Sequence, residues 1–259
     1  MAKRIEDFKI LDNKQIGKDF YILELSSPGL LPDILPGQFV QIRIDGSPET
    51  FLRRPFSVYD ADYKRNTLKL LYQVVGKGTE AMSLLNRDEI VNLVYPLGNS
   101  FSDPSGSEKI ILIGGGVGIA PFLYFARHLK DLKCEVEMLF GFRNMERMID
   151  YEEFRAYGKV HITTEDGSAG EKGFVTDHSV LAKINFDRIY CCGPDPMMKA
   201  VAKYASSKGV FCEVSLENLM GCGFGICLCC IVPTTSGNLC SCTDGPVFNI
   251  KNLKWQTSE

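Results

Sequence analysis

The chain has 259 residues, of which 45% are hydrophobic and 24% charged, and its net charge is −3. This composition is ordinary for a globular protein and lacks the clustered Lys and Arg of a nucleic-acid-binding surface. The longest apolar run, 110–126, is broken by glycines and Pro121, so we expect no membrane span and neither nucleic acid nor a membrane as partner.

Residues 1–101 are predicted to form short strands that are separated by turns. The segments rich in β-branched and aromatic residues are 20–25, 39–44, 68–75 and 90–94. Turn clusters such as Pro36-Gly37 and residues 45–48 lie between them, and one helix is expected at 79–85. Several short strands at this spacing predict a small antiparallel β-barrel.

Two short motifs in this part suggest a ligand site. Residues 53–57 read Arg-Arg-Pro-Phe-Ser. Arg54 offers a fork for phosphate, Phe56 a ring for stacking, and Ser57 a hydroxyl for a ring nitrogen. Residues 76–79, Gly-Lys-Gly-Thr, form a glycine loop before the predicted helix, and its N–H groups suit a pyrophosphate. Each motif also has a plainer interpretation, a solvated edge strand for the first and an ordinary turn for the second.

From about residue 107 to residue 213 the pattern changes to strands that alternate with helices. The predicted strands are 110–113, 136–140, 160–164 and 188–192, and the predicted helices are 122–132 and 196–208. Pro196 stands at the start of the second helix, where proline is favoured. This alternation predicts a parallel, doubly wound α/β sheet.

A glycine loop at 114–118 follows the first of these strands and precedes a helix, the context in which such a loop binds phosphate. It departs from the common dinucleotide fingerprint because Pro121 stands where a glycine is usual. The glycines could also serve only close strand–helix packing. Residues 163–168 and 192–197 follow two other strands, and the carboxyl edge of such a sheet is where ligands bind.

The last part of the chain contains six of the ten cysteines. Cys222, Cys227 and Cys230 have the spacing C-x4-C-x2-C, and Cys242 follows twelve positions later. This order predicts a plant-type 2Fe–2S site, and the interleaved glycines let the backbone approach the cluster. Four thiolates could instead bind zinc, although zinc sites usually show paired C-x2-C motifs.

Two further cysteines leave the ligand set partly open. Cys229 adjoins Cys230, and adjacent residues do not easily face one metal centre. Cys240 competes more directly with Cys242, which we prefer because the turn at 244–246 fixes its direction. The thiols and the lack of an apolar signal segment at the N-terminus indicate a cytoplasmic metal centre rather than disulfides.

Together, the Arg-Pro-Phe-Ser segment, the glycine loop ending in Pro121, the Cys-Gly-Pro strand end and the cysteine tail resemble the ferredoxin–NAD(P) reductase superfamily. The stretches 217–230 and 242–248 are similar in particular to the electron-transfer subunits of dihydroorotate dehydrogenase B. The resemblance covers essentially the whole chain. It implies an FAD-binding β-barrel at 1–101, an NAD-binding α/β domain at 102–213 and a 2Fe–2S domain at 214–259.

The resemblance also implies site residues. The FAD site would comprise Arg54, Pro55, Phe56, Ser57, Leu71, Tyr72, Gln73, Gly78 and Thr79. The NAD(H) site would comprise Gly114, Gly115, Gly116, Gly118, Cys192, Gly193 and Pro194. The cluster ligands would be Cys222, Cys227, Cys230 and Cys242, and the catalytic residues Ser57, Cys192 and Glu217. Phe56 stands where the superfamily usually has tyrosine, and Cys229 where the family commonly has glycine.

The implied function is electron transfer in pyrimidine biosynthesis. A partner subunit with FMN would oxidise dihydroorotate, and electrons would pass through the cluster and FAD to NAD⁺ in a heterotetramer of two plus two chains. FAD suits this place because it handles one and two electrons, whereas nicotinamide takes only hydride. Glu165 and Asp166 favour NADH over NADPH, because an acid near the ribose 2′ position would reject the extra phosphate.

Two alternatives stay open. The first is a related flavin and iron–sulfur subunit that serves NADPH:ferredoxin oxidoreduction or sulfide and polysulfide reduction. Such relatives have aspartate where Cys222 stands, so this cysteine favours dihydroorotate. The second is a non-catalytic interaction module with a zinc-binding tail, which would be colourless.

Overall fold

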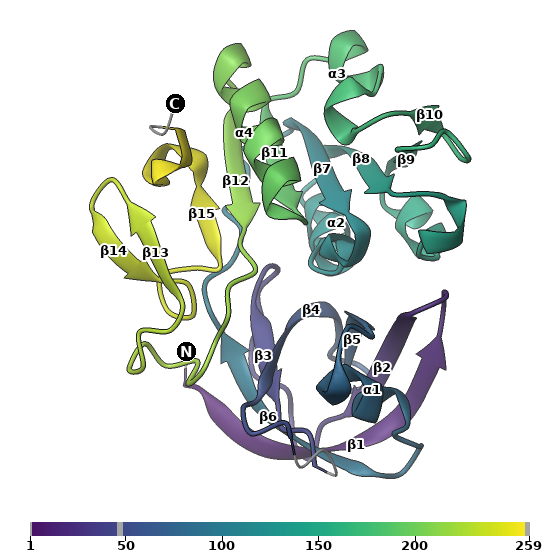
Figure 1. The fold of residues 1–259 in the computed structure, drawn as a ribbon, viewed down its shortest axis with the longest axis vertical. Coiled ribbons are helices and arrows are strands. Elements are labelled where there is room, and N and C mark those ends of the chain that lie inside the picture. The colour runs from purple at the N-terminus through teal and green to yellow at the C-terminus, as the bar shows by residue number, and fades with distance from the viewer. Residues whose placement is uncertain (1, 46–48, 257–259) are drawn as a thin grey trace.

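The first part of the chain closes into an antiparallel β-barrel in the computed structural model, which describes residues 2–45 and 49–256 (Figure 1). The strand order around the barrel is β1-β2-β5-β4-β3-β6. These strands are β1 (Arg4–Gln15), β2 (Phe20–Ser26), β3 (Phe39–Ile42), β4 (Arg54–Asp62), β5 (Thr67–Gln73) and β6 (Ile90–Leu97). Alternate side chains point inward, so that Leu23 and Leu25 of β2 meet Leu68 and Leu70 of β5 in one core.

The predicted barrel elements agree with the structure, which adds β1 and extends the short segment at 53–57 to strand β4. The strands expected at 20–25, 39–44, 68–75 and 90–94 correspond to β2, β3, β5 and β6. The expected helix is α1 (Lys77–Ser83), which begins two residues earlier than predicted. Strand β1 was not expected, because many of its side chains are charged and exposed. Residues 46–48 of the turn expected at 45–48 lie outside the described residues.

The second part forms a sheet of order β10-β9-β8-β7-β11-β12-β15, which lies above the barrel in Figure 1. Its strands are β7 (Lys109–Gly115), β8 (Glu135–Phe142), β9 (Lys159–Thr164), β10 (Glu171–Lys172), β11 (Arg188–Cys192), β12 (Phe211–Ser215) and β15 (Val247–Asn249). All neighbouring strands pair in parallel except β12 and β15, which are antiparallel. The expected doubly wound sheet is therefore confirmed, with one added edge strand from the tail.

Helices cover both faces of this sheet. They are α2 (Phe122–Asp131), α3 (Val180–Lys183) and α4 (Asp195–Lys208), with short 3₁₀ helices η1 (Gly116–Ile119), η2 (Met145–Arg147), η3 (Glu152–Ala156), η4 (Val175–Asp177), η5 (Ile250–Asn252) and η6 (Lys254–Gln256). Helix α2 buries Phe122, Phe125, Ala126 and Leu129, the spacing of one apolar helical face. Helix α4 ends at Gly209, whose left-handed φ of 67° is typical of a helix C-cap.

The sheet separates two hydrophobic cores. In β7, Ile110 and Leu112 face the core that contains α2, whereas Ile111 and Ile113 face the core that contains α4. The first core also includes Phe20, Tyr59 and Leu71 of the barrel, so barrel and sheet share buried apolar side chains. This shared core fixes the two parts against each other.

The tail packs against both parts. A hairpin of β13 (Ile231–Thr234) and β14 (Gly237–Cys240) lies beside the sheet edge that β15 completes (Figure 1). Asn99, just after the barrel, donates its amide to the Asp244 carbonyl at 2.7 Å and accepts the Val247 N–H at 3.2 Å. The tail therefore bridges the barrel and the sheet, while the domain boundaries expected at 101 and 213 stay a prediction. No helix within the described ranges has the length and apolar character that crossing a bilayer requires.

We predict that Leu129→Ala destabilises the chain far more than Leu132→Ala. Leu129 is fully buried on α2, and deleting a buried leucine side chain costs about 2–5 kcal/mol. Leu132 at the end of the same helix is 40% exposed, so its loss should cost about 0.5 kcal/mol or less. Chemical denaturation measures both free energies of unfolding. Equal losses would contradict the packing of α2 onto the sheet.

Candidate cofactor sites

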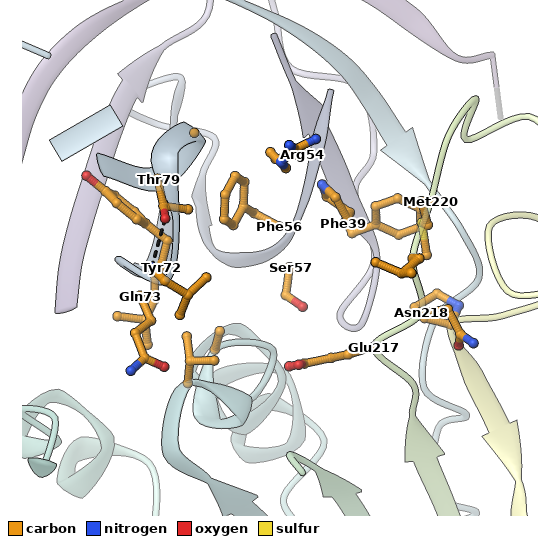
Figure 2. A pocket seen from close by; sticks show the side chains of 18 of the residues that line it. Phe39, Arg54, Phe56, Ser57, Tyr72, Gln73, Thr79, Glu217, Asn218 and Met220 are labelled. Carbon is orange, nitrogen blue, oxygen red and sulfur yellow. Dashed lines mark hydrogen bonds between the residues drawn. The ribbon is translucent and has the colours of Figure 1, made fainter. Parts of the chain in front are cut away.

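A cavity of about 560 Å³ lies between the barrel, the first turn after β7 and the start of the tail (Figure 2). It contains every residue of the expected FAD site. Its lining comprises Phe39, Arg54, Pro55, Phe56, Ser57, Leu71, Tyr72, Gln73, Val75, Gly76, Lys77, Gly78, Thr79, Val117, Ala120, Ser215, Leu216, Glu217, Asn218, Leu219, Met220 and Pro246. The tail residues in this wall, apart from Glu217, were not expected as part of the FAD site, because nothing in a linear motif says which surface a loop will face.

Strand β4 and its neighbour β5 supply the aromatic wall of this cavity. Phe56 meets the Tyr72 ring edge-on, with centroids 5.9 Å apart, and Tyr21 stacks on the other side of Tyr72. Tyr72 donates its hydroxyl to Asn13 Oδ1 at 2.9 Å, which fixes the ring. Arg54 donates one N–H to the Leu52 carbonyl and otherwise projects toward the cavity (Figure 2). These residues fit a flat aromatic ring system that carries phosphate, the chemistry of a flavin dinucleotide.

The glycine loop before α1 has a more structural role than its sequence suggests. The Thr79 hydroxyl accepts the Val75 N–H at 2.9 Å and donates to the Gly76 carbonyl at 2.9 Å, so it closes the loop. A Cβ at Gly78 would lie 3.1 Å from Ile44 Cδ1, which leaves little space for a side chain. Gly78 and Thr79 thus shape the cavity wall from within the loop.

The expected catalytic residues approach the cavity from different elements. Ser57 lies on β4, and Glu217 extends toward it from the segment after β12 (Figure 2). Glu217 is exposed and its side chain reaches the cavity, where desolvation by the cavity walls raises the pKa of its carboxyl above the ordinary value. Cys192 is not in the cavity wall: it is buried at the end of β11, paired with Ser215. Burial, with the nearby Glu217 carboxylate, raises the pKa of the Cys192 thiol.

A second cavity of about 580 Å³ opens at the carboxyl edge of the parallel strands. It is lined by Phe20, Gln73, Gly115, Gly116, Gly141, Phe142, Arg143, Arg147, Thr163, Glu165, Gly173, Phe174, Val175, Thr176, Pro194, Pro196, Met197 and Ala200. Gln73 lines both cavities, so the two meet at the end of β5. The cations Arg143 and Arg147 were missed from the sequence, because isolated arginines after a strand carry no spacing signal.

Only part of the expected NAD(H) set lines this second cavity. Gly115, Gly116 and Pro194 do, and Gly116 has a left-handed φ of 54°. Gly118 instead packs under the loop: a Cβ there would lie 2.5 Å from the Cys192 carbonyl oxygen. Gly114 is similarly confined by Ile119, and Gly193 by Gly115. Gly114 and Gly118 are therefore closely packed against strand and loop, and their part in an NAD(H) site stays a prediction.

The cysteine loop turns through left-handed residues. Gly223 and Gly225 have φ of 76° and 77°, values that glycine adopts without strain. The Phe224 N–H donates to Cys222 Sγ at 3.3 Å, and the Gly225 N–H donates to Cys242 Sγ at 3.2 Å. These N–H donors fit thiolates in a cluster site, because hydrogen bonds to the charged form stabilise it.

The cysteines of the tail lie in different environments, which shift the pKa values of their thiols in different directions. Backbone N–H groups, chiefly that of Cys227, lower the pKa of Cys222 to about 6. Burial raises the pKa of Cys242 to about 12, so ionisation of this thiol calls for a compensating cation. Cys229 is exposed, and Cys240 ends β14 opposite Ile231. Within the described ranges no three His, Cys, Asp or Glu side chains lie close enough together to bind one metal ion. A 2Fe–2S cluster needs no such group of three, because each of its irons takes two cysteines.

Comparisons with known proteins agree with this layout. The chain matches the family model of the iron–sulfur cluster binding domain of dihydroorotate dehydrogenase B at residues 217–254 and that of an oxidoreductase NAD-binding domain at 112–203. It is 37% identical to the dihydroorotate dehydrogenase B (NAD⁺) electron transfer subunit of Clostridium acetobutylicum, covering 93% of each chain. The corresponding subunit of Caldanaerobacter subterraneus is 39% identical, with 93% of this chain and 94% of the relative covered.

Solved structures give the same picture. The structure of an NADH-dependent reduced ferredoxin–NADP oxidoreductase superposes with a TM-score of 0.87 at 32% identity, covering 96% of this chain and 90% of the other. A ferredoxin reductase of carbazole 1,9a-dioxygenase has a TM-score of 0.71 at 20% identity, covering 81% of this chain and 67% of the other, a likeness of fold alone.

We predict that Glu217→Gln changes the pH dependence of stability in the flavin-free chain. A carboxyl with a raised pKa holds its proton in the folded state to higher pH than in the unfolded state, so its ionisation destabilises the fold as pH rises. The free energy of unfolding of the variant, relative to wild type, should therefore increase between about pH 4 and about pH 8. Denaturant titrations across this range measure the difference between the two proteins, in which the contributions of other carboxyls with a raised pKa, such as Glu213, cancel. A difference that stays flat or decreases would contradict the desolvation of the Glu217 carboxyl by the cavity walls.

Proposed function

The chain belongs to the family of dihydroorotate dehydrogenase B (NAD⁺) electron-transfer subunits, and on this premise we propose the path that electrons take through it. They leave the FMN of a dihydroorotate-oxidising partner subunit, enter a 2Fe–2S cluster on the tail, pass to FAD in the first cavity and reduce NAD⁺ in the second. We further propose that two copies of each chain form a heterotetramer in the reducing cytoplasm, where the thiols of the tail stay reduced.

The observation that carries this proposal is the order of the three sites. Phe39 and Met220 line the first cavity and also pack in one buried cluster with Cys230 and Cys242. At the other end of that cavity, Gln73 is shared with the second cavity. A flavin in the first cavity would thus have the cysteine loop on one side and a nicotinamide site on the other.

Each group of residues has a separate task in this proposal. Arg54 neutralises phosphate, Phe56 contacts the plane of the flavin, and the fully buried Tyr72 supports the Phe56 ring from behind. Ser57 donates a hydrogen bond to the ring, and Glu217 closes the cavity against water. Cys192, buried at the end of β11 outside both cavity walls, supports the loop at Gly118 and does not react covalently. When bound, FAD supplies the conversion between single-electron and hydride transfer.

A second candidate function rests on the superposition with the ferredoxin–NADP oxidoreductase. Arg143 and Arg147 in the second cavity could receive a 2′-phosphate, the group that distinguishes NADPH, whereas Glu165 in the same wall favours NADH. Cys222 favours the dihydroorotate function, because the alternative family has aspartate at this position. The nicotinamide preference therefore separates the two functions experimentally.

The first test is a visible spectrum with iron and sulfide assays on protein purified anaerobically, alone and with its candidate partner. We expect flavin bands and about two irons and two sulfides per chain. Dihydroorotate should bleach the spectrum only when the partner is present. Zinc without flavin would overturn the redox function, and reduction by NADPH but never by dihydroorotate would favour the second candidate.

The cysteine assignment has its own test in six single Cys→Ser variants of the tail. We expect serine at Cys222, Cys227, Cys230 or Cys242 to abolish or strongly deplete the cluster, because each removes a thiolate ligand. The matched variants Cys229→Ser and Cys240→Ser should retain about two irons per chain. Iron analysis and the electron paramagnetic resonance (EPR) spectrum of the reduced cluster measure both. Iron loss in Cys240→Ser with retention in Cys242→Ser would reverse the choice between these two residues.

A further inference from the structure

Gln41 is a polar side chain that is buried between strand β3 and the tail, beside apolar residues of both. Strand β3 directs Val40 and Ile42 into the barrel core, and the alternate residues Phe39 and Gln41 face the tail. Phe39 there joins the apolar cluster that contains Cys230 and Cys242. Gln41 is fully buried beside it, so the tail has covered a strand face on which a polar residue would otherwise meet water.

The Gln41 amide contacts the first turn of the cysteine loop. Its Nε2 donates to the Gly221 carbonyl at 3.4 Å, and its Oε1 is buried without a hydrogen-bond partner. A Cβ at Gly223 would lie 2.8 Å from that Oε1, so the loop backbone rests directly on the amide. Cys222, one of the proposed cluster ligands, stands between the two glycines.

The backbone of the same residue pairs with the strand that carries the proposed flavin motif. Gln41 pairs with Pro55 across the ladder between β3 and β4, and its own carbonyl accepts an N–H from Arg53 at 3.4 Å. The backbone of Gln41 is thus tied to the flavin motif while its side chain is tied to the cysteine loop. An unpaired buried carbonyl costs about 1–3 kcal/mol, so its retention calls for a reason other than stability.

We propose that Gln41 is a positioning residue that holds the cysteine loop against the flavin-binding strand and sets the reduction potential of the cluster. This inference rests on the proposed function, because it takes Cys222 and its partners as cluster ligands. Hydrogen bonds and local dipoles are among the terms that set the potential of an iron–sulfur cluster. With Nε2 bound to Gly221, the negative end of the amide dipole faces the loop, which disfavours the added electron.

The test is a potentiometric titration, followed by EPR, of the full-length chain carrying Gln41→Leu. Removing the dipole should raise the midpoint potential of the cluster and change its EPR g-values, while the flavin potential stays the same. We expect the ratio of reduced to oxidised cluster at the wild-type midpoint to rise about threefold to tenfold, the upper value corresponding to about 59 mV for one electron.

A second variant and a matched control make the test specific. Gln41→Glu has nearly the same shape and adds negative charge once its buried carboxyl ionises, so it should lower the midpoint potential increasingly as pH rises. Gln38→Leu also removes a buried glutamine at the β3 edge, but the Gln38 amide binds Gly98 and Leu35 within the barrel and not the cysteine loop. This control should reduce stability and leave the cluster potential unchanged.

The outcomes separate this inference from the proposed function. A wild-type chain without iron and sulfide would remove the proposed function itself. A wild-type cluster whose potential and EPR spectrum are the same in both Gln41 variants would overturn only the role of Gln41. Equal shifts in Gln38→Leu and Gln41→Leu would overturn it too, because they would report general loosening of the barrel. Loss of iron from both Gln41 variants would also count against it, since the four cysteines are expected to hold the cluster.

Discussion

The buried contact between the tail and strand β3 is the interaction on which the rest of this structure depends. Phe39, Val94 and Leu97 of the barrel pack with Met220, Cys230 and Cys242 of the tail. Burial of these apolar side chains orders a loop that has almost no regular secondary structure of its own. Because Phe39 and Met220 also line the first cavity, the contact that stabilises the cysteine loop also places it next to the proposed flavin.

Much of the fold was predictable because its elements carry strong local patterns. The apolar strand and glycine loop at 110–118 and the apolar face of α2 predicted the parallel sheet correctly. Strand β1 escaped prediction, since its charged residues face solvent and its pairing partners are distant in sequence. Strand β15 escaped for another reason: three residues cannot show a period, and only pairing with β12 makes them a strand.

The site residues that could be predicted are those with distinctive side-chain chemistry. Those whose role depends on contacts between distant segments could not be predicted. Arginine, aromatic and cysteine motifs pointed to phosphate, flavin and cluster, and the structure gathers the expected FAD residues around one cavity. The role of Gln73 at the junction of two cavities could not be derived, because it depends on how the barrel meets the sheet. The role of Gln41 could not be predicted either. Alternation along β3 indicates a side chain that points out of the barrel, and only the folded tail buries it.

Strand β15 has a consequence for how such a protein could be assembled from parts. The tail leaves the sheet after β12 and returns to pair antiparallel with that same strand, so its last segment completes the edge of the nucleotide-binding sheet. Truncation before β15 would leave a sheet edge with unpaired N–H and C=O groups, which invites association with other chains. A cluster-binding tail of this kind is therefore difficult to transfer to another reductase, because the recipient sheet would need an open edge with which the last strand of the tail can pair.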